Sequence, residues 1–478
     1  MRSRGLLGAR AALLAGPVVL AFFSGGYFDR ARTGAGIVAW VLVGAAALCA
    51  LRPVPRARAP RLALAGLFGL AAWTTLSIVW APMAGPAYHD GQRVFLYAGA
   101  LLAASALLRG RATLRALDPA VAGGALIVIG YGLSERLLPG LVTLAHSRSA
   151  FGRLDQPLTY WNTTGVLAAL GIVLCARIAG DATRAKGLRA AAAAAAAPLG
   201  LGLYITFSRG ALFACATGLL VLAVARPDRA RWRGGVIAVG AAVAGGLAAA
   251  PFAGITRLAG THGERISEGL AGLGLLVAIA LVAVVLSLRA RLSSEPLALP
   301  RAAPWIALAL VAGGFALFLA VGSHESQGQT VATHGAARLT SLQSNRYAYW
   351  KVAGRMFTHA PLIGEGASSF APQWLRHRPF AEGARDAHSL YVETLGELGL
   401  VGLALLAAFL AGVAWAARDA LRLAPGLAAG PTAGAALMAA HAAIDWDWEM
   451  PAVILPVLLL SGALLGLADL RAPARRAA

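Results

Sequence analysis

Apolar stretches of about twenty residues recur along the whole chain, and short segments rich in arginine separate them. One helix needs about 20 mainly apolar residues to cross the hydrocarbon core of a bilayer. The pattern therefore predicts a series of membrane-spanning helices. We identify candidate spans at residues 11–28, 33–51, 62–81, 94–108, 116–134, 162–180, 188–206, 210–225, 234–255, 269–288, 302–322, 399–416, 424–441 and 451–468.

Several of these spans are rich in Ala and Gly, as in the alanine run 190–197, and such residues favour close helix packing more than insertion. The sequence thus predicts an all-α polytopic membrane protein with about 12–14 transmembrane helices. Arg2, Arg4 and Arg10 precede the first span, but no convincing cleavage site follows it, so we interpret this span as a retained anchor and not a signal peptide.

One long polar interruption divides the predicted helices. We expect transmembrane helices 1–11 in residues 1–322, a large loop carrying active-site helices in residues 323–398, and transmembrane helices 12–14 with a tail in residues 399–478.

Composition excludes a soluble globular domain, because the 478 residues are 58% hydrophobic and 13% charged, with a mean hydropathy of +0.69. The net charge of +21 would suit a nucleic-acid partner, but the basic residues do not form one patch. Most Lys and Arg fall in alternate connections between the spans, which also hold few of the acidic residues. By the positive-inside rule, both termini are cytoplasmic and the large loop is extracytoplasmic.

Within the large loop, "LTSLQSNRYAYWKVAGRMFTHAPLIGEG" (339–366) predicts a helix that Ser344 or Asn345 caps and that Pro361 and the following glycines end. Its apolar face combines Arg346, Tyr349, Trp350, Ala353 and Phe357. Arg346 lies in the first turn, where the helix dipole disfavours a cation. An unfavourable local choice of this kind indicates a functional residue.

A second helix is predicted from "RDAHSLYVETLGELGLVG" (385–402), with Asp386 as its N-cap. His388 then lies in the first turn, at the outer membrane boundary. A helix N-terminus favours the neutral imidazole over the cation, and a neutral imidazole can act as a base.

Five segments in this order resemble the O-antigen ligase and polymerase superfamily: "GRLDQPLTYWNTTGVLAAL" (152–170), "TFSRGALFA" (206–214), "SNRYAYWKVAGRMFTHAPLIGEGASSF" (344–370), "AHSLYVETLGELGLVGLAL" (387–405) and "HAAIDWDWEMPA" (441–452). The resemblance extends over roughly residues 65–465. It departs from the family pattern where Ser389, in place of the usual Asn, follows the histidine, and where "TYWN" replaces Asn-Pro-Asn.

The resemblance implies a GT-C-like glycosyltransferase of the bacterial inner membrane that uses a glycan carried by undecaprenyl pyrophosphate. By position in the motifs, Arg209 and Arg346 match the arginines that bind the pyrophosphate, and His388 matches the histidine that activates the acceptor hydroxyl. The active site then faces the periplasm or cell exterior.

The chemistry of the three residues fits that reaction. Guanidinium groups bind phosphate oxygens in pairs and stay charged, so Arg209 and Arg346 would stabilise the departing pyrophosphate. His388 would take the proton of the attacking hydroxyl in a single displacement with inversion. Such a mechanism needs neither a metal nor a cofactor.

A wider set of residues is a candidate for contacts with the substrates. Loop cations are usually solvated and interfacial aromatics often form a membrane belt, so each also has an ordinary structural interpretation. The alternate acidic residues of "DWDWEMP" could suggest a metal site, but we expect them to bind acceptor hydroxyls or to pair with an arginine. The candidates are Arg153, Tyr160, Trp161, Tyr349, Trp350, Lys351, Arg355, Asp445 and Asp447.

Two other classes remain open: a polytopic transporter or lipid-linked sugar flippase, and a non-catalytic assembly scaffold. Transporters usually have midplane charges and repeated halves, which this sequence lacks. Polymerase and ligase also remain open, with a glycan, lipid or protein as acceptor.

Overall fold

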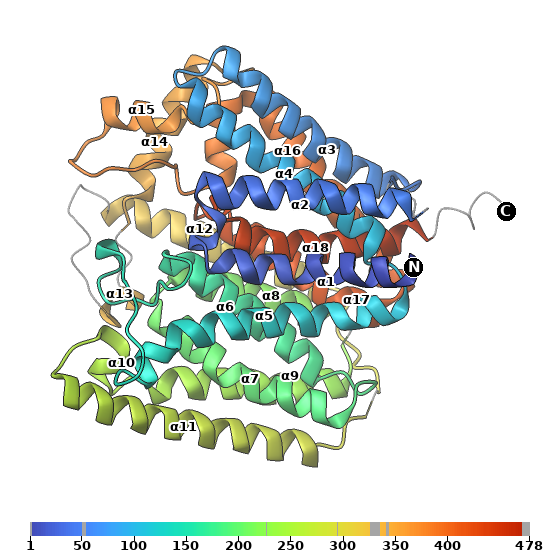
Figure 1. Ribbon diagram of the computed structural model, residues 1–478, viewed down its shortest axis with the longest axis vertical. Helices are drawn as coiled ribbons and strands as arrows, with labels where there is room; N and C mark the ends of the chain where they lie inside the picture. The colour runs from blue at the N-terminus through green and yellow to red at the C-terminus, as the bar shows by residue number, and fades with distance from the viewer. Residues whose placement is uncertain are drawn as a thin grey trace.

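The computed structural model describes residues 2–49, 54–225, 227–293, 295–325, 335–340 and 344–470. Within these ranges the chain forms helices and no β-strand, and every predicted span coincides with a helix (Figure 1). The long helices are α1 (Arg2–Ala21), α2 (Asp29–Leu48), α3 (Arg58–Leu76), α4 (Ala84–Leu107), α5 (Arg111–Leu137), α6 (Trp161–Ala179), α7 (Lys186–Ile205), α8 (Arg209–Ala225), α9 (Arg229–Ala248), α11 (His262–Arg289), α12 (Ala303–Glu325), α16 (Leu390–Leu423), α17 (Pro425–His441) and α18 (Pro451–Asp469). The short ones are α10 (Ala253–Arg257), α13 (Ala337–Thr340), α14 (Arg346–His359), α15 (Phe370–His377) and the 3-10 turns η1 (Ser24–Gly26), η2 (Ser77–Val79), η3 (Arg148–Ala150) and η4 (Asp447–Glu449).

Eight helices of the described chain are long and apolar enough to cross a membrane: α2, α3 continued through η2, α5, α6, α7, α11, α16 and α18. Three shorter apolar helical segments accompany them, at Gly5–Ala21, Arg209–Ala225 and Ala303–Leu317. The predicted class, an all-α polytopic membrane protein, is therefore confirmed. The predicted number of crossings stays a prediction.

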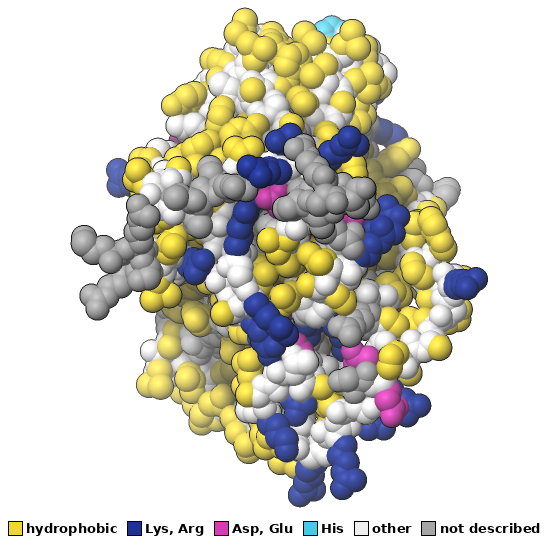
Figure 2. Space-filling view, turned by 90° about the vertical axis from the view of Figure 1, so that its right-hand side faces the viewer, with side chains coloured by type: hydrophobic (Ala, Val, Ile, Leu, Met, Phe, Trp, Pro, Cys, Tyr) yellow, Lys and Arg dark blue, Asp and Glu magenta, His cyan; other side chains and the backbone are white. Residues whose placement is uncertain are grey.

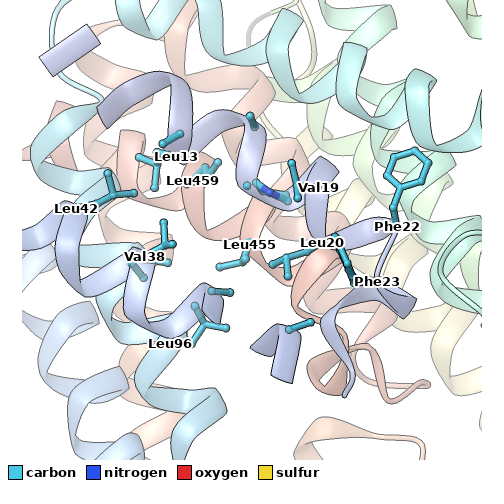
Figure 3. Close-up of a pocket in the computed structure, with 18 of the residues that line it drawn as sticks. Leu13, Val19, Leu20, Phe22, Phe23, Val38, Leu42, Leu96, Leu455 and Leu459 are labelled. Atoms are coloured by element: carbon cyan, nitrogen blue, oxygen red, sulfur yellow. The ribbon is translucent and has the colours of Figure 1, made fainter. Parts of the chain in front are cut away.

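Helices α6 and α18 form the centre of the bundle, and the apolar window of each is completely buried. Helix α6 packs against α5, α7, α8 and α9, whereas α18 packs against α1, α4, α16 and α17. A cavity of about 790 Å³ with an almost wholly apolar lining lies between α1, α2, α4 and α18 (Figure 3).

The bundle has two distinct ends. The short helices α13, α14 and α15 lie at one end, which we call the loop end (Figure 1). Helix α1 begins and α18 ends at the opposite end, which we call the terminal end. Figure 2 faces the terminal end and shows many Lys and Arg side chains with few acidic ones among them. The predicted separation of basic connections from the large loop is therefore a property of the folded molecule.

A kink in α16 positions the elements of the loop end. Gly399 has φ +64°, and a Cβ there would collide with the carbonyl oxygen of Leu362. Because the kink interrupts the helical hydrogen bonds, the N–H groups of Leu400 and Val401 donate to Pro361 and Leu362 at 2.9 and 3.2 Å. The segment "HAPLIGEG" that follows α14 is thus held against the backbone of α16.

Candidate active site

Asp445 is the centre of a hydrogen-bonded cluster at the loop end. It lies between α17 and α18, has no exposed surface, and forms an ion pair with Arg346 of α14 at 2.7 Å. Tyr160 and Asn162 each donate a hydrogen bond of 2.7 Å to the same carboxylate. Burial opposes the ionisation of Asp445, but the neighbouring groups, with the Arg346 guanidinium first among them, together keep the pKa of the carboxyl below its usual value. The cluster therefore joins three distant parts of the chain around one carboxylate.

His388 lies beside this cluster, between two aromatic rings. Its ring centroid is 5.0 Å from that of Tyr349 and 6.4 Å from that of Trp446. Nδ1 donates to the carbonyl oxygen of Asp386 at 3.0 Å, which leaves Nε2 as the basic nitrogen. Burial lowers the pKa of His388 to about 4, with opposing contributions from Asp445, which raises it, and Arg346, which lowers it. The imidazole is therefore neutral at neutral pH.

The predicted capping of this segment is wrong. Ser389, and not Asp386, is the N-cap of α16, because its hydroxyl accepts the N–H of Val392 and the helix begins at Leu390. His388 itself has φ +54°, a left-handed backbone that cannot belong to the helix. His388 thus precedes the helix, and its neutrality results mainly from burial and not from the helix dipole.

The two predicted anion-binding arginines each occupy the first position of a helix. Arg346 begins α14 after Asn345, one of the two caps that the sequence predicts, and Arg209 begins α8 after the short turn from α7. A helix N-terminus carries partial positive charge, which adds to that of each guanidinium when an anion binds nearby. Arg346 is part of the Asp445 cluster, whereas Arg209 precedes Gly210, which packs on His441, the partner of the next carboxylate, Asp447.

Asp447 and His441 form a second buried pair that the sequence analysis does not include. The carboxylate of Asp447 accepts the Nδ1 of His441 and the hydroxyl of Thr163, the latter at 3.1 Å. Both His441 and Asp447 have no exposed surface. A Cβ at Gly210 would lie 3.1 Å from His441 Nε2, so the imidazole packs directly on the first turn of α8 beside Arg209. A histidine at the end of an apolar span, followed by two aspartates, is the signal that could have indicated this pair.

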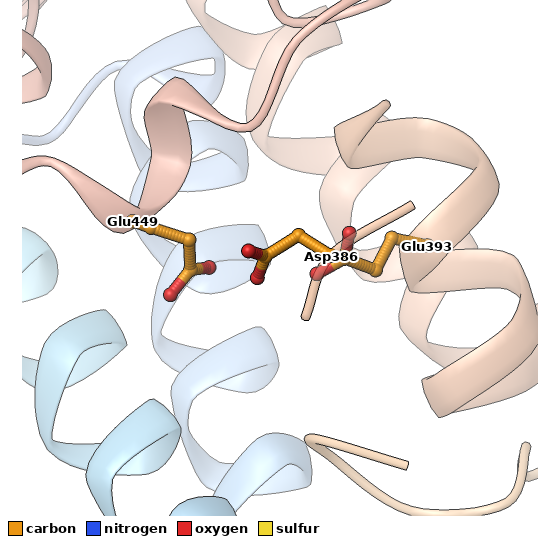
Figure 4. A group of neighbouring side chains, drawn as sticks. All are labelled: Asp386, Glu393 and Glu449. Atoms are coloured by element: carbon orange, nitrogen blue, oxygen red, sulfur yellow. The ribbon is translucent and has the colours of Figure 1, made fainter. Parts of the chain in front are cut away.

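A group of acidic residues flanks the cluster, and the sequence analysis did not predict that they lie together. The carboxylates of Asp386, Glu393 and Glu449 offer oxygens that lie within 4.8 Å of one another (Figure 4). Arg93 of α4 forms ion pairs with Glu449 and with Asp90. Burial raises the pKa of Asp386 to about 7 and that of Glu449 well above its usual value, although Arg93 opposes both shifts. This trio could hold a cation, but Arg93 already neutralises part of its charge.

The structure places the other predicted residues in three settings. Tyr160 and Tyr349 contact the site directly. Arg153 is buried, stacks on the ring of Trp161 at 3.5 Å, and donates to carbonyls of its own loop, so that this pair supports the loop next to Tyr160. Trp350 packs beside the apolar cluster of α14 and α15, while Lys351 and Arg355 lie on the exposed face of α14.

The loop before α6 is fixed by its own network, which holds Tyr160 in position. His146 bridges Glu135 and Asp155 with N···O distances of 2.5 and 2.8 Å. Arg136 donates to the carbonyl oxygens of Ile255 and Gly152. These contacts attach the loop to α5 and to α10.

The fold and the site define a multi-pass membrane protein with two arginines, a neutral histidine and buried carboxylates at one end of its helical bundle. Residues 266–407 match the O-antigen ligase family. This match, which includes Arg346 and His388, supports the O-antigen ligase superfamily and an O-antigen ligase-like enzyme, so the resemblance in the sequence is confirmed. Arg209 and Asp445 lie outside the matched residues. No curated protein matches the chain.

Proposed function

We propose that this protein is an inverting glycosyltransferase that moves an oligosaccharide or polysaccharide from undecaprenyl pyrophosphate to an acceptor hydroxyl. The reaction takes place on the outer face of the bacterial inner membrane, with both termini cytoplasmic. The observation that carries the proposal is the neutral His388 beside the Arg346–Asp445 ion pair at the loop end.

The proposed reaction has one displacement. Nε2 of His388 takes the proton of the acceptor hydroxyl while the oxygen attacks the anomeric carbon of the donor sugar. The bond between this carbon and the pyrophosphate oxygen breaks, and the electron pair leaves with the pyrophosphate. Arg209 and Arg346 neutralise the charge that develops there, which is the role that a divalent cation has in many other transferases.

Asp445 has a positioning role in this mechanism. Its carboxylate holds Arg346 at 2.7 Å and is itself held by Tyr160 and Asn162, so the guanidinium has a fixed orientation before the donor binds. A preoriented charge costs little reorganisation when the leaving group departs.

The experiment that tests the function is complementation of a deletion strain with the wild-type gene or with His388→Ala. His377→Ala is the matched control, since His377 is an exposed histidine of the same region. Surface glycan and lipid-linked intermediates are measured in each strain. We expect His377→Ala to restore the glycan and His388→Ala to fail.

The intermediates then distinguish the remaining alternatives. Accumulation of single lipid-linked repeats indicates a polymerase, and accumulation of long lipid-linked chains indicates a ligase. Normal glycan in the His388→Ala strain contradicts the mechanism and favours the scaffold. Intermediates that accumulate only on the cytoplasmic face favour the flippase.

A further inference from the structure

A long apolar groove begins beside the candidate active site and follows the bundle toward the terminal end. It has a volume of about 920 Å³ and lies between α8, α16, α17 and α18. Leu406, Phe409 and Val413 of α16 and Met438 of α17 are among the apolar residues that line it. Exposed Ala414 also lines it, so the groove is open to the surface of the bundle.

The groove is continuous with the site at its loop end. Tyr391 and Ala442 line the groove there, and hydrogen bonds of 2.8 Å join Leu390 to Ala442 and Tyr391 to Ala439. His388 precedes Leu390 by two residues, and Asp445 follows Ala442 by three. A chain that leaves the groove at this point therefore meets the histidine and the Arg346–Asp445 pair.

The length and the polar ends of the groove suit a membrane lipid chain. From Leu406 to Arg422, α16 spans about 24 Å at its helical rise, close to the thickness of the hydrocarbon core, which is about 30 Å. Arg418 and Arg422 line the terminal end, where lipid headgroups lie. One wall is α8, which begins with Arg209 at the loop end and contributes Val221 and Val224 farther along. The wall of the groove and a candidate pyrophosphate ligand are thus parts of one helix.

The cavity between α1, α2, α4 and α18 does not have this continuity. Its lining is equally apolar, but it includes neither the residues next to His388 nor those next to Asp445 (Figure 3). Of these two spaces, only the groove between α8, α16, α17 and α18 connects a bilayer-length apolar surface to the site.

We propose that the groove between α8, α16, α17 and α18 holds the polyprenyl chain of the donor while its pyrophosphate lies at the loop end. This proposal rests on the proposed function, because it assigns a place to the lipid part of the same donor. It also implies a preference for long carriers, since each further isoprene unit adds apolar contact between the chain and the groove.

The test compares donors of two chain lengths, one with a full polyprenyl chain and one with two isoprene units, in detergent or vesicles. Ala414→Phe fills the groove, and Ala411→Phe is the matched control, because Ala411 is an exposed alanine of the same helix that does not line it. The quantity measured is the ratio of kcat/KM for the long donor to that for the short donor. We expect this ratio to fall at least tenfold in Ala414→Phe, through KM, and to stay at the wild-type value in Ala411→Phe.

A second measurement uses a photoreactive polyprenyl pyrophosphate with the wild-type protein. We expect crosslinks to peptides of α16 and α17 that an excess of unlabelled polyprenyl pyrophosphate removes. An unchanged ratio in Ala414→Phe overturns the proposal. Crosslinks that phospholipid removes equally well also overturn it, and so do crosslinks between two copies of the chain.

The two proposals can fail separately. If wild-type protein transfers no glycan from either donor, the proposed function fails. A normal wild-type rate with an unchanged ratio in Ala414→Phe refutes the groove proposal alone.

Discussion

Asp445 accepts hydrogen bonds from Tyr160, Asn162 and Arg346, so we expect it to be the most sensitive position. Asp445→Asn removes the ion pair and leaves the partly buried Arg346 without its counter-charge. Breaking a fully buried pair typically costs about 3–5 kcal/mol, which is the upper bound here. We expect glycan transfer to fall about 100-fold or more and the thermal midpoint to fall, both measurable on purified protein.

The control for this substitution is Asp419→Asn, an acidic residue near the far end of α16. It should retain transfer, because Asp419 lies far from the loop end. A fully active Asp445→Asn variant would show that the orientation of Arg346 does not matter for the reaction.

The low pKa of His388 leads to a pH prediction. Because burial lowers its pKa to about 4, the basic form is present at all higher pH values and is lost only as the pH falls through about 4. The kcat/KM profile reports ionisations of the free enzyme, so its acidic limb should lie near pH 4, below the ordinary histidine range of about 6.5. A limb near pH 6.5 would contradict the buried setting of the imidazole.

The contribution of His146 to stability should decrease as the pH rises. The hydrogen bond with Asp155 is the main cause that raises the pKa of His146. Burial opposes this shift, and Glu135 adds to it. A raised native pKa means that the stabilisation is complete below the unfolded value of about 6.5 and is lost as the pH rises through the native pKa. The thermal midpoint of wild type minus that of His146→Gln should therefore be larger at pH 5.5 than at pH 8.5. His377→Gln should show no such dependence.

Among the elements, the kink of α16 is the feature that fixes the loop end to the membrane helices. Gly399→Ala places a Cβ against the Leu362 carbonyl in a backbone conformation, φ +64° and ψ −163°, that is almost exclusive to glycine and alone costs roughly 1–3 kcal/mol for another residue. We expect a lower thermal midpoint and a loss of transfer. The matched control is Gly354→Ala in α14, where no atom lies within 4 Å of the new Cβ and stability should rise slightly.

The sequence predicts the long helices well because each of them is recognised from the apolar composition of its own segment. Each predicted span has its helix, and α14 begins at Arg346 after Asn345, one of the two caps that the sequence predicts. Prediction failed where tertiary contacts decide the backbone: the left-handed His388 moves the start of α16 to Leu390, and the burial of Arg153 depends on Trp161. Arg93 was missed because its partner Glu449 is distant in sequence, and spacing carries no signal for such a pair. His441 is only six residues from Asp447, and its place before the two aspartates was a signal that the sequence analysis did not use.

For the whole molecule, the proposed orientation can be tested by cysteine labelling. Cys49, Cys175 and Cys215 are first replaced by alanine, since all three are free cysteines. A membrane-impermeant maleimide should then label Arg355→Cys, on the exposed face of α14, in intact cells. It should label Arg111→Cys, at the terminal end, only after permeabilisation. Equal labelling of both in intact cells would contradict the topology.

The Asp445 cluster also has a consequence for biogenesis. Its members are separated by as many as 285 residues along the chain, and Asp445 leaves the ribosome after Arg346 and Tyr160. Arg346 and Tyr160 are already inserted at that time but have no carboxylate to hold them. The site is therefore assembled only when α17 and α18 enter the bundle, so a nascent chain or a product truncated before residue 445 cannot carry out the reaction.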